Sequence, residues 1–185
     1  MHLRHLMELP DLLPSHIAEW DRACGEMSQV YSGAGTFLYV GRGVHYAIAR
    51  EGALKLKEIS YAHAEGYPAG ELKHGPNALV DEHCPVVVIA THDPSDPDSV
   101  LRYRKTLATI DEIRSRGGIA IAVANAGDEA VARLAHHVLA VPSAPELLLP
   151  IVEVIPLQLF AYHIAVANGC DVDNPRNLVK SVVEE

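Results

Sequence analysis

Two clusters of charged side chains, close together in the sequence, hold most of the groups that could carry out chemistry. If the first cluster is helical, Glu51, Lys55 and Glu58 lie at positions i, i+4 and i+7 and share one face. The second cluster, with Lys73 and His74, follows in the next segment of the chain. Carboxylates, amines and an imidazole beside a strand-to-helix turn are what proton transfer on a small sugar or carbonyl substrate requires.

Both clusters also have a simpler interpretation. The first could be a solvated helix face with a Glu–Lys pair, which stabilises a helix by only about 0.2–0.5 kcal/mol. His74 could be an ordinary surface histidine beside a Gly-Pro turn. Two observations favour function. The helix follows the turn after the first predicted strand, and the segment 61–77 is dense in Gly, His, Glu and Tyr, which are costly to bury without purpose.

A third candidate is the turn Gly41-Arg42-Gly43 between the first predicted strand and this helix. Glycines there let backbone N–H groups approach an anion, and a helix N-terminus adds a favourable field. The third glycine of the dinucleotide-binding pattern is missing, so a plain tight turn is the alternative.

Several other chemistries have no support in the sequence. The eleven histidines show neither HxH nor HExxH spacing, so we expect no metal site and no cofactor. Cys24, Cys84 and Cys170 form no CxxC pair and no disulfide framework, and are expected to be small buried residues in a reducing cytoplasm.

Composition limits the partners. The 185 residues suit one domain, and the net charge of −9 argues against a general nucleic-acid or anionic-membrane partner. The N-terminus lacks the pattern of a signal peptide. The most apolar segment, 147–167, is interrupted by Pro150, Glu153 and Pro156 and is not expected to span a membrane.

The order of predicted elements indicates an α/β fold. Four continuous apolar runs predict buried strands at 36–40, 85–90, 119–124 and 137–141. Helices are predicted at 6–31, 45–62, about 100–116, 128–135 and 146–168, with Ser15 as a possible N-cap within the first. Continuous apolar strands alternating with helices are typical of a parallel, doubly wound sheet in a three-layer α/β/α sandwich, which binds ligands at the carboxyl ends of its strands.

Longer motifs resemble a known family. They are AREGALKLKEISY (49–61), HAE (63–65), AGELKHGP (69–76), PLQLFAYH (156–163) and DVDNPRNLVKSV (171–182). Together they closely resemble the glutamine–fructose-6-phosphate aminotransferases (isomerizing), also called glucosamine-6-phosphate synthases. The resemblance is to the second of that family's two sugar isomerase (SIS) modules, which have a flavodoxin-like sheet. It covers nearly the whole chain, and implies an N-terminal helical linker at 1–34, the SIS domain at 35–170 and an active-site tail at 171–185.

The resemblance implies specific roles for side chains. Glu58 matches the glutamate that moves a proton between C1 and C2 of the sugar, and Lys55 a lysine that assists near these carbons. Lys180 matches the tail lysine that forms a Schiff base with the open-chain ketose. His74 matches a histidine that opens the sugar ring and comes from the neighbouring subunit of a dimer. Val179 matches a tail residue whose backbone contacts substrate.

The chain also departs from the family. It has no glutaminase domain with a catalytic N-terminal cysteine and no first SIS module, whose Ser/Thr-rich loop grips the sugar phosphate. The corresponding loop here contains Gly41, Arg42 and Gly43 but no Ser or Thr cluster; Arg42 is its only candidate for meeting a phosphate.

We therefore expect the isomerase half-module of a glucosamine-6-phosphate synthase. It would be a homodimer that helps to convert fructose 6-phosphate to glucosamine 6-phosphate with the missing SIS and glutaminase modules. Two alternatives stay open: a non-catalytic module that binds sugar phosphates, and a stand-alone phosphosugar isomerase.

Overall fold

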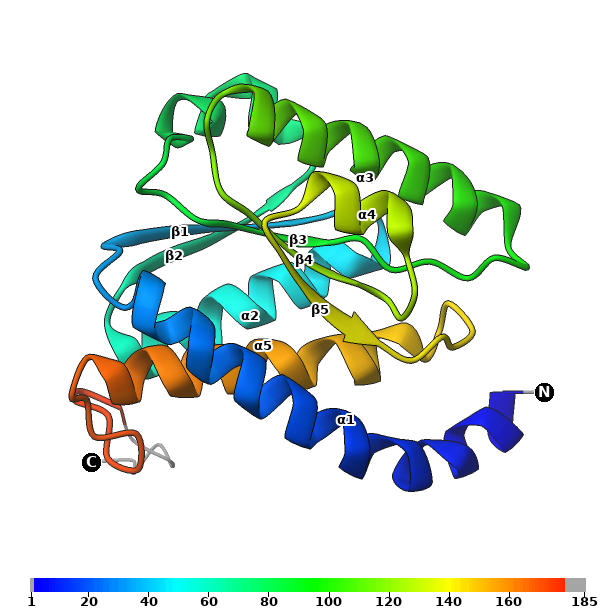
Figure 1. The fold of residues 1–185 in the computed structure, drawn as a ribbon, viewed down its shortest axis with the longest axis horizontal. Helices are drawn as coiled ribbons and strands as arrows, with labels where there is room; N and C mark the ends of the chain where they lie inside the picture. The colour runs from blue at the N-terminus through cyan, green and yellow to red at the C-terminus, as the bar shows by residue number, and fades with distance from the viewer. Residues whose placement is uncertain (1, 179–185) are drawn as a thin grey trace, which may run out of the picture.

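The computed structural model describes residues 2–178 and contains one five-stranded parallel sheet (Figure 1). The strands follow the order β2-β1-β3-β4-β5, so the order reverses between β1 and β3. This is the flavodoxin-like, doubly wound arrangement, and it confirms the predicted fold class. The strands are β1 (Thr36–Gly41), β2 (His63–Pro68), β3 (Val86–Ile89), β4 (Ala120–Asn125) and β5 (His137–Val141).

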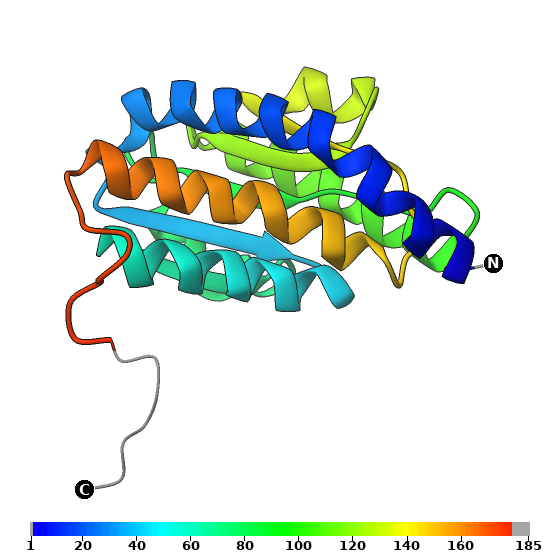
Figure 2. The ribbon, with the colours of Figure 1, turned by 90° about the horizontal axis from the view of Figure 1, so that it is seen from below.

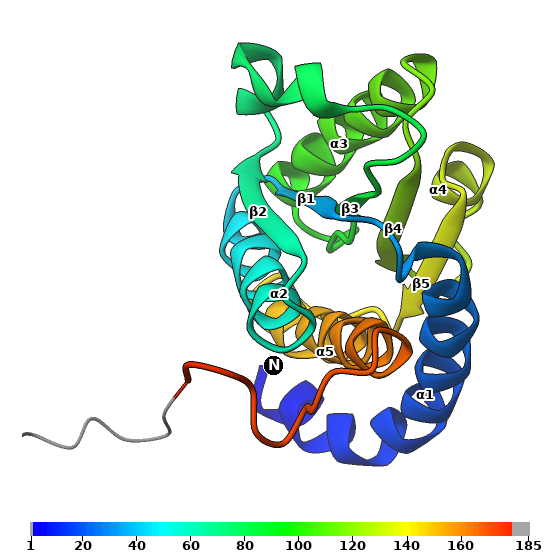
Figure 3. The ribbon, with the colours of Figure 1, turned by 90° about the vertical axis from the view of Figure 1, so that its left-hand side faces the viewer.

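Helices cover both faces of the sheet. One layer contains α1 (His2–Tyr31), α2 (Val44–Ser60) and α5 (Leu149–Ala167); the other contains α3 (Pro97–Ser115), α4 (Glu129–Leu134) and the 3₁₀ helices η1 (Glu71–His74) and η2 (Pro76–Leu79) (Figure 3). In β1, Phe37 and Tyr39 pack toward the first layer, whereas Leu38 and Val40 pack toward the second. All four are fully buried, which explains why the strand is apolar throughout rather than alternating.

Strand β2 was not predicted. Its sequence, HAEGYP, is polar, and the helix predicted before it, at 45–62, ends two residues earlier, at Ser60. It is an edge strand that pairs only with β1, from Thr36↔His63 to Gly41↔Pro68, so it is half-buried and does not need an apolar run. Gly66 lets α2 pack closely on it, because a Cβ there would lie 2.7 Å from the Arg50 Cα.

Helix α1 begins four residues earlier than predicted and continues through Pro10 and Pro14. Ser15 is therefore not an N-cap; it lies inside the helix, where its Oγ donates to the Leu12 carbonyl at 3.0 Å. Buried Trp20 ties α1 to β5 by donating its indole N–H to the Ala140 carbonyl at 2.7 Å. The apolar face of α1 thus belongs to the same core as the sheet, while the domain boundary near residue 34 stays a prediction.

Helix α5 runs between α1 and α2 on one face of the sheet (Figure 2). It is long and apolar enough to cross a membrane by length and composition, although Pro150, Glu153 and Pro156 were expected to prevent this. Half of its apolar stretch is buried, with Leu157 and Phe160 in the core. A helix buried in this way is typical of the centre of a helical layer.

Candidate functional site

The charged face predicted on α2 is present. Lys55 Nζ lies 2.7 Å from Glu58 Oε2 and 3.6 Å from Glu51 Oε1. The side chains of Lys55 and Glu58 are 32% and 27% exposed, so both are partly shielded and still accessible. Because α2 runs back along β1, Glu58 lies about 22 Å along the helix axis from Gly43. The pair is therefore near the amino edge of the sheet, not the carboxyl edge.

The pair fixes the charge of Lys55. Its hydrogen bond to Glu58 holds the pKa of Lys55 above the ordinary value of 10.5, against an opposing effect of partial burial, and the charges of Glu58 and Glu51 act in the same direction. At neutral pH, Lys55 is an ammonium group. It can orient a carboxylate or stabilise negative charge on a sugar oxygen, but it is not poised to form an imine.

His74 lies far from this pair within one chain. It is exposed at the end of η1, on the other face of the sheet from α2, just after the carboxyl end of β2. Glu58 lies just before the amino end of β2, and the strand between them spans roughly 17 Å. The neighbouring Lys73 pairs with Glu112 of α3 at 3.3 Å. The two clusters that are close in sequence are thus separated in the fold.

The Gly41-Arg42-Gly43 turn lies at the carboxyl edge of β1, above a buried acidic group. Gly41 packs so closely that a Cβ would lie 2.3 Å from the His45 carbonyl oxygen. Below the turn, His45 Nδ1 lies 2.8 Å from Glu153 Oε1, and the Thr91 hydroxyl donates to the same carboxylate. This buried carboxylate is thus held by His45 and Thr91 inside the fold. The glycines have a clear role in the tight turn, and their part in substrate binding stays a prediction.

Val179 and Lys180 lie outside the described residues. The tail leading to them is described as far as Leu178, and it contacts the end of α2. The Arg176 N–H donates to the Tyr61 hydroxyl at 3.0 Å, and the Arg176 guanidinium lies 4.0 Å from the centre of the Tyr61 ring. Tyr61 follows α2 directly and is three residues from Glu58. The described tail is therefore anchored at the residue that follows α2, three residues along the chain from Glu58.

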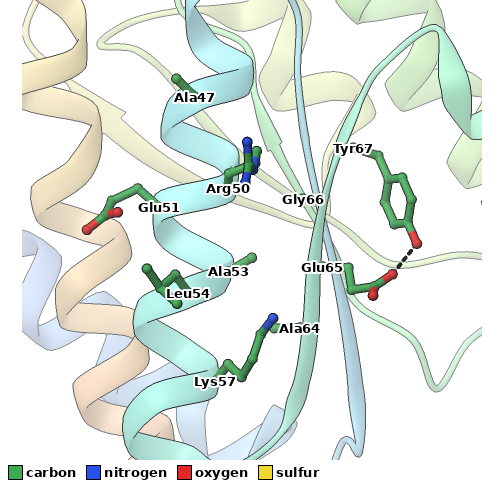
Figure 4. A pocket seen from close by; sticks show the side chains of 10 residues that line it. All are labelled: Ala47, Arg50, Glu51, Ala53, Leu54, Lys57, Ala64, Glu65, Gly66 and Tyr67. Carbon is green, nitrogen blue, oxygen red and sulfur yellow. Dashed lines mark hydrogen bonds between the residues drawn. The ribbon is translucent and has the colours of Figure 1, made fainter. Parts of the chain in front are cut away.

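A groove of about 650 Å³ lies between α2 and β2 (Figure 4). Its basic side chains are Arg50 and Lys57, two helical turns apart, and Lys57 extends toward β2 whereas Glu51 points away from it. The Tyr67 hydroxyl donates to Glu65 on its β2 side. Sequence reasoning missed this groove because β2 was not recognised. Its lining residues are Ala47, Arg50, Glu51, Ala53, Leu54, Lys57, Ala64, Glu65, Gly66 and Tyr67.

All three cysteines are free thiols, and burial disfavours the reactive thiolate of Cys24 and Cys84. Burial is the main cause that raises the pKa of Cys24 to about 12 and of Cys84 to about 11, while Cys170 is only partly buried. Among residues 2–178, no group of three or more His, Cys, Asp or Glu side chains is arranged to hold a metal ion. The charged groups that the structure brings together on α2 are two carboxylates and an ammonium group.

Comparison with known proteins gives consistent similarities over the whole chain. The chain is 50% identical over 185 residues to a glutamine–fructose-6-phosphate aminotransferase (isomerizing) from Chlorobaculum tepidum. It is 54% identical over 183 residues to the enzyme of that name from Thermus thermophilus. The matches include 100% and 99% of this chain but only 29% of each relative.

A solved structure is similar to this chain in both sequence and fold. The C-terminal domain of glucosamine-fructose-6-phosphate aminotransferase from Francisella tularensis is 38% identical, with a TM-score of 0.77, over 91% of this chain and 46% of that one. These similarities confirm the resemblance recognised in the motifs. The SIS domain family matches residues 31–168, which is most of the chain and includes every described strand and α2 to α5. This protein therefore belongs to the SIS domain family.

Proposed function

We propose that this chain is the isomerase half-module of a glucosamine-6-phosphate synthase and helps to convert fructose 6-phosphate to glucosamine 6-phosphate. The observation that carries the proposal is the Lys55–Glu58 pair beside the anchored C-terminal tail. This combination occurs in a chain that is half identical, along its whole length, to proteins named for this reaction.

The proposed chemistry divides between α2 and the tail. Lys180 forms an imine with C2 of the open-chain ketose, with loss of water. Ammonia derived from glutamine later displaces Lys180 as the free amine and leaves its own nitrogen at C2. Glu58 takes a proton from C1 and returns it to C2, which converts the ketose imine to the 2-amino aldose. Lys55, as an ammonium group, orients Glu58 and stabilises negative charge that develops on the sugar.

The position of the anchor supports a role for Lys180. Tyr61 lies one helical turn beyond Glu58, about 4.5 Å along the axis. Lys180 follows Arg176 by four residues, and four residues extend at most about 14 Å. The chain is therefore long enough to bring a lysine on the tail to a sugar held at Glu58.

His74 enters the proposed site from a second copy of the chain. Within one chain it lies at the opposite edge and face of the sheet from Glu58, and it is exposed. A homodimer that brings η1 of one copy to α2 of the other would place an imidazole beside the sugar ring oxygen. We propose this arrangement for ring opening.

The phosphate would be held by another module. The loop at the carboxyl edge of this one has no Ser or Thr cluster, and the chain spans 29% of the length of its relatives. An exposed apolar stripe on α5 offers a surface for a second SIS module. The stripe contains Ile151, Tyr162 and Val166.

Three free cysteines suit a reducing cytoplasm as the place of reaction.

Exchange of the C1 proton tests the central step directly. The chain, alone and mixed with a first SIS module from a relative, is incubated with fructose 6-phosphate and ammonium in deuterium oxide. We expect the mixture to incorporate deuterium at C1 and to form glucosamine 6-phosphate, and Glu58→Gln to lose both activities by at least about 10²-fold. A Glu19→Gln variant on α1 is the matched control.

Each other outcome has a definite meaning. Equal activity of wild type and Glu58→Gln contradicts the catalytic role. Binding of the sugar phosphate in calorimetry, without exchange or product, favours the non-catalytic binding module. Turnover of a ketose phosphate by the chain without the second module favours the stand-alone isomerase.

A further inference from the structure

The link between α2 and the C-terminal tail is built in an unusual way. Tyr61 ends α2 with φ 62° and ψ 7°, in the left-handed region. Glycine or asparagine normally occupies that position at the end of a helix, and a bulky residue there is strained. The strain is tolerated only if the tyrosine side chain makes contacts that offset it.

Those contacts come from the tail. The Tyr61 hydroxyl accepts the Arg176 backbone N–H at 3.0 Å, and the ring lies under the Arg176 guanidinium at 4.0 Å. The hydrogen bond and the cation–π contact join residues that are 115 positions apart. Nearer the end of α5, the Cys170 thiol lies 3.8 Å from the carbonyl oxygen of Ser60, the last residue of α2. The end of α2 thus holds the tail at two points.

The tail itself is organised locally up to this anchor. The Asp171 carboxylate accepts the backbone N–H groups of Asp173 at 3.0 Å and Asn174 at 3.1 Å, which forms a turn. Directly after Arg176, Asn177 also has a left-handed backbone, with φ 62°. The anchor therefore lies between two bends of the described tail.

We infer that Tyr61 and Arg176 form a latch that positions the C-terminal tail for the chemistry at Glu58. Tyr61 and Arg176 are positioning residues; neither needs to touch the sugar. The functional part of this inference rests on the proposed role of Lys180, whereas the latch itself can be tested without any substrate.

The first experiment measures the latch alone. Hydrogen exchange is followed by mass spectrometry on the peptide 170–178 in the full chain. Tyr61→Phe removes the hydrogen-bond acceptor, and Tyr61→Gly removes the ring while suiting the left-handed backbone. We expect tail exchange to rise about threefold in Tyr61→Phe and about tenfold in Tyr61→Gly, with α2 exchange unchanged. Tyr46→Phe, on the same helix, is the control. Equal tail exchange in wild type and Tyr61→Gly would overturn the latch.

The second experiment measures positioning. The chain, mixed with a first SIS module, is treated with fructose 6-phosphate and borohydride, which reduces an imine to a stable secondary amine on the lysine. The part of this adduct that Lys180→Met abolishes is assigned to Lys180. We expect Tyr61→Gly and Arg176→Ala to lower the rate at which the Lys180 adduct forms about tenfold, without weakening sugar binding. Arg176→Lys should form the adduct faster than Arg176→Ala, because it keeps a cation over the Tyr61 ring. Arg133→Ala on α4 is the control.

The two experiments separate the two claims. If tail exchange rises in Tyr61→Gly and adduct formation is unchanged, the positioning role is wrong. If exchange rises but wild type forms no adduct at Lys180, the proposed function fails while the latch stands.

Discussion

The ammonium group of Lys55 is shared by two carboxylates, at 2.7 Å from Glu58 and 3.6 Å from Glu51. Lys55 and Glu58 therefore form a close ion pair, and Lys55 and Glu51 form a looser one. The close pair constrains Glu58, whereas Glu51 mainly adds negative charge. This asymmetry distinguishes the roles of the two glutamates.

Lys55→Met should lower formation of glucosamine 6-phosphate by about 10²-fold, because Glu58 loses its orienting partner and the sugar loses a cation. Lys55→Arg should retain more activity than Lys55→Met since it keeps the charge. The raised pKa means that Lys55 stays charged below pH 10.5, so its contribution is lost only as pH rises through the higher folded value. Steady-state assays of the two-module mixture measure this, with Lys105→Met on α3 as the control. Wild-type activity in Lys55→Met would contradict the assignment.

Stability should fall on mild acidification because of His137. Burial, with a contribution from neighbouring His136, holds the pKa of His137 below its ordinary 6.5, and Nε2 lies 2.8 Å from the Tyr31 hydroxyl. The unfolded chain takes up this proton near pH 6.5 and the folded chain only at lower pH. The stabilisation is therefore full above pH 6.5 and is lost as pH falls through the folded value.

Urea unfolding at pH 7.5 and 5.5 checks this expectation. The free energy of unfolding should be lower at pH 5.5, and His137→Gln should reduce the difference between the two values. His83→Gln, at an exposed site, should leave the difference unchanged. An unaltered difference in His137→Gln would exclude this histidine as the cause.

The buried pair of His45 and Glu153 should behave as one unit. Their side chains are 3% and 0% exposed and lie 2.8 Å apart, so removing one partner leaves the other buried without its nearest ionisable neighbour. Either His45→Leu or Glu153→Leu alone should lower the free energy of unfolding by about 3 kcal/mol, and the double variant by much less than the sum. A double-mutant cycle in urea measures the coupling. Additive effects would show that the pair does not act together.

Gly66 should resist substitution because α2 approaches β2 so closely there. A Cβ at this position would lie 2.7 Å from the Arg50 Cα and 2.9 Å from its backbone nitrogen, which cannot move without shifting the helix. Gly66→Ala should destabilise the chain by about 1–3 kcal/mol and narrow the groove. Gly33→Ala is the matched control, since no atom lies within 4 Å of its added Cβ. Equal thermal midpoints for the two variants would contradict the close packing.

The buried parts of the fold were predictable from the sequence for a physical reason. Strands β1, β3 and β4 are covered on both faces, so every position must be apolar and the runs stand out. β2 has neighbours on one side only, and its polar residues are compatible with that place. A local apolar pattern indicates burial, and β2 has no such pattern. The other edge strand, β5, keeps the apolar run HVLAV and was predicted.

The site was predictable only where it depends on local spacing. Glu51, Lys55 and Glu58 share a face because helix geometry alone brings them together. The Tyr61–Arg176 contact depends on how α5 and α2 end beside each other, and no pattern within either segment indicates it. His74 shows the opposite case: it is near Glu58 in sequence, and the intervening strand carries it to the other edge of the sheet.

The left-handed tyrosine at the end of α2 has a consequence for protein engineering and evolution. Glycine adopts this backbone without strain, so selection for thermal tolerance alone would favour glycine at position 61 wherever relief of strain outweighs the lost contacts to Arg176. The inferred latch predicts that selection for turnover would favour tyrosine. A library of variants at position 61 would then be enriched in glycine when screened for thermal tolerance and in tyrosine when screened for turnover.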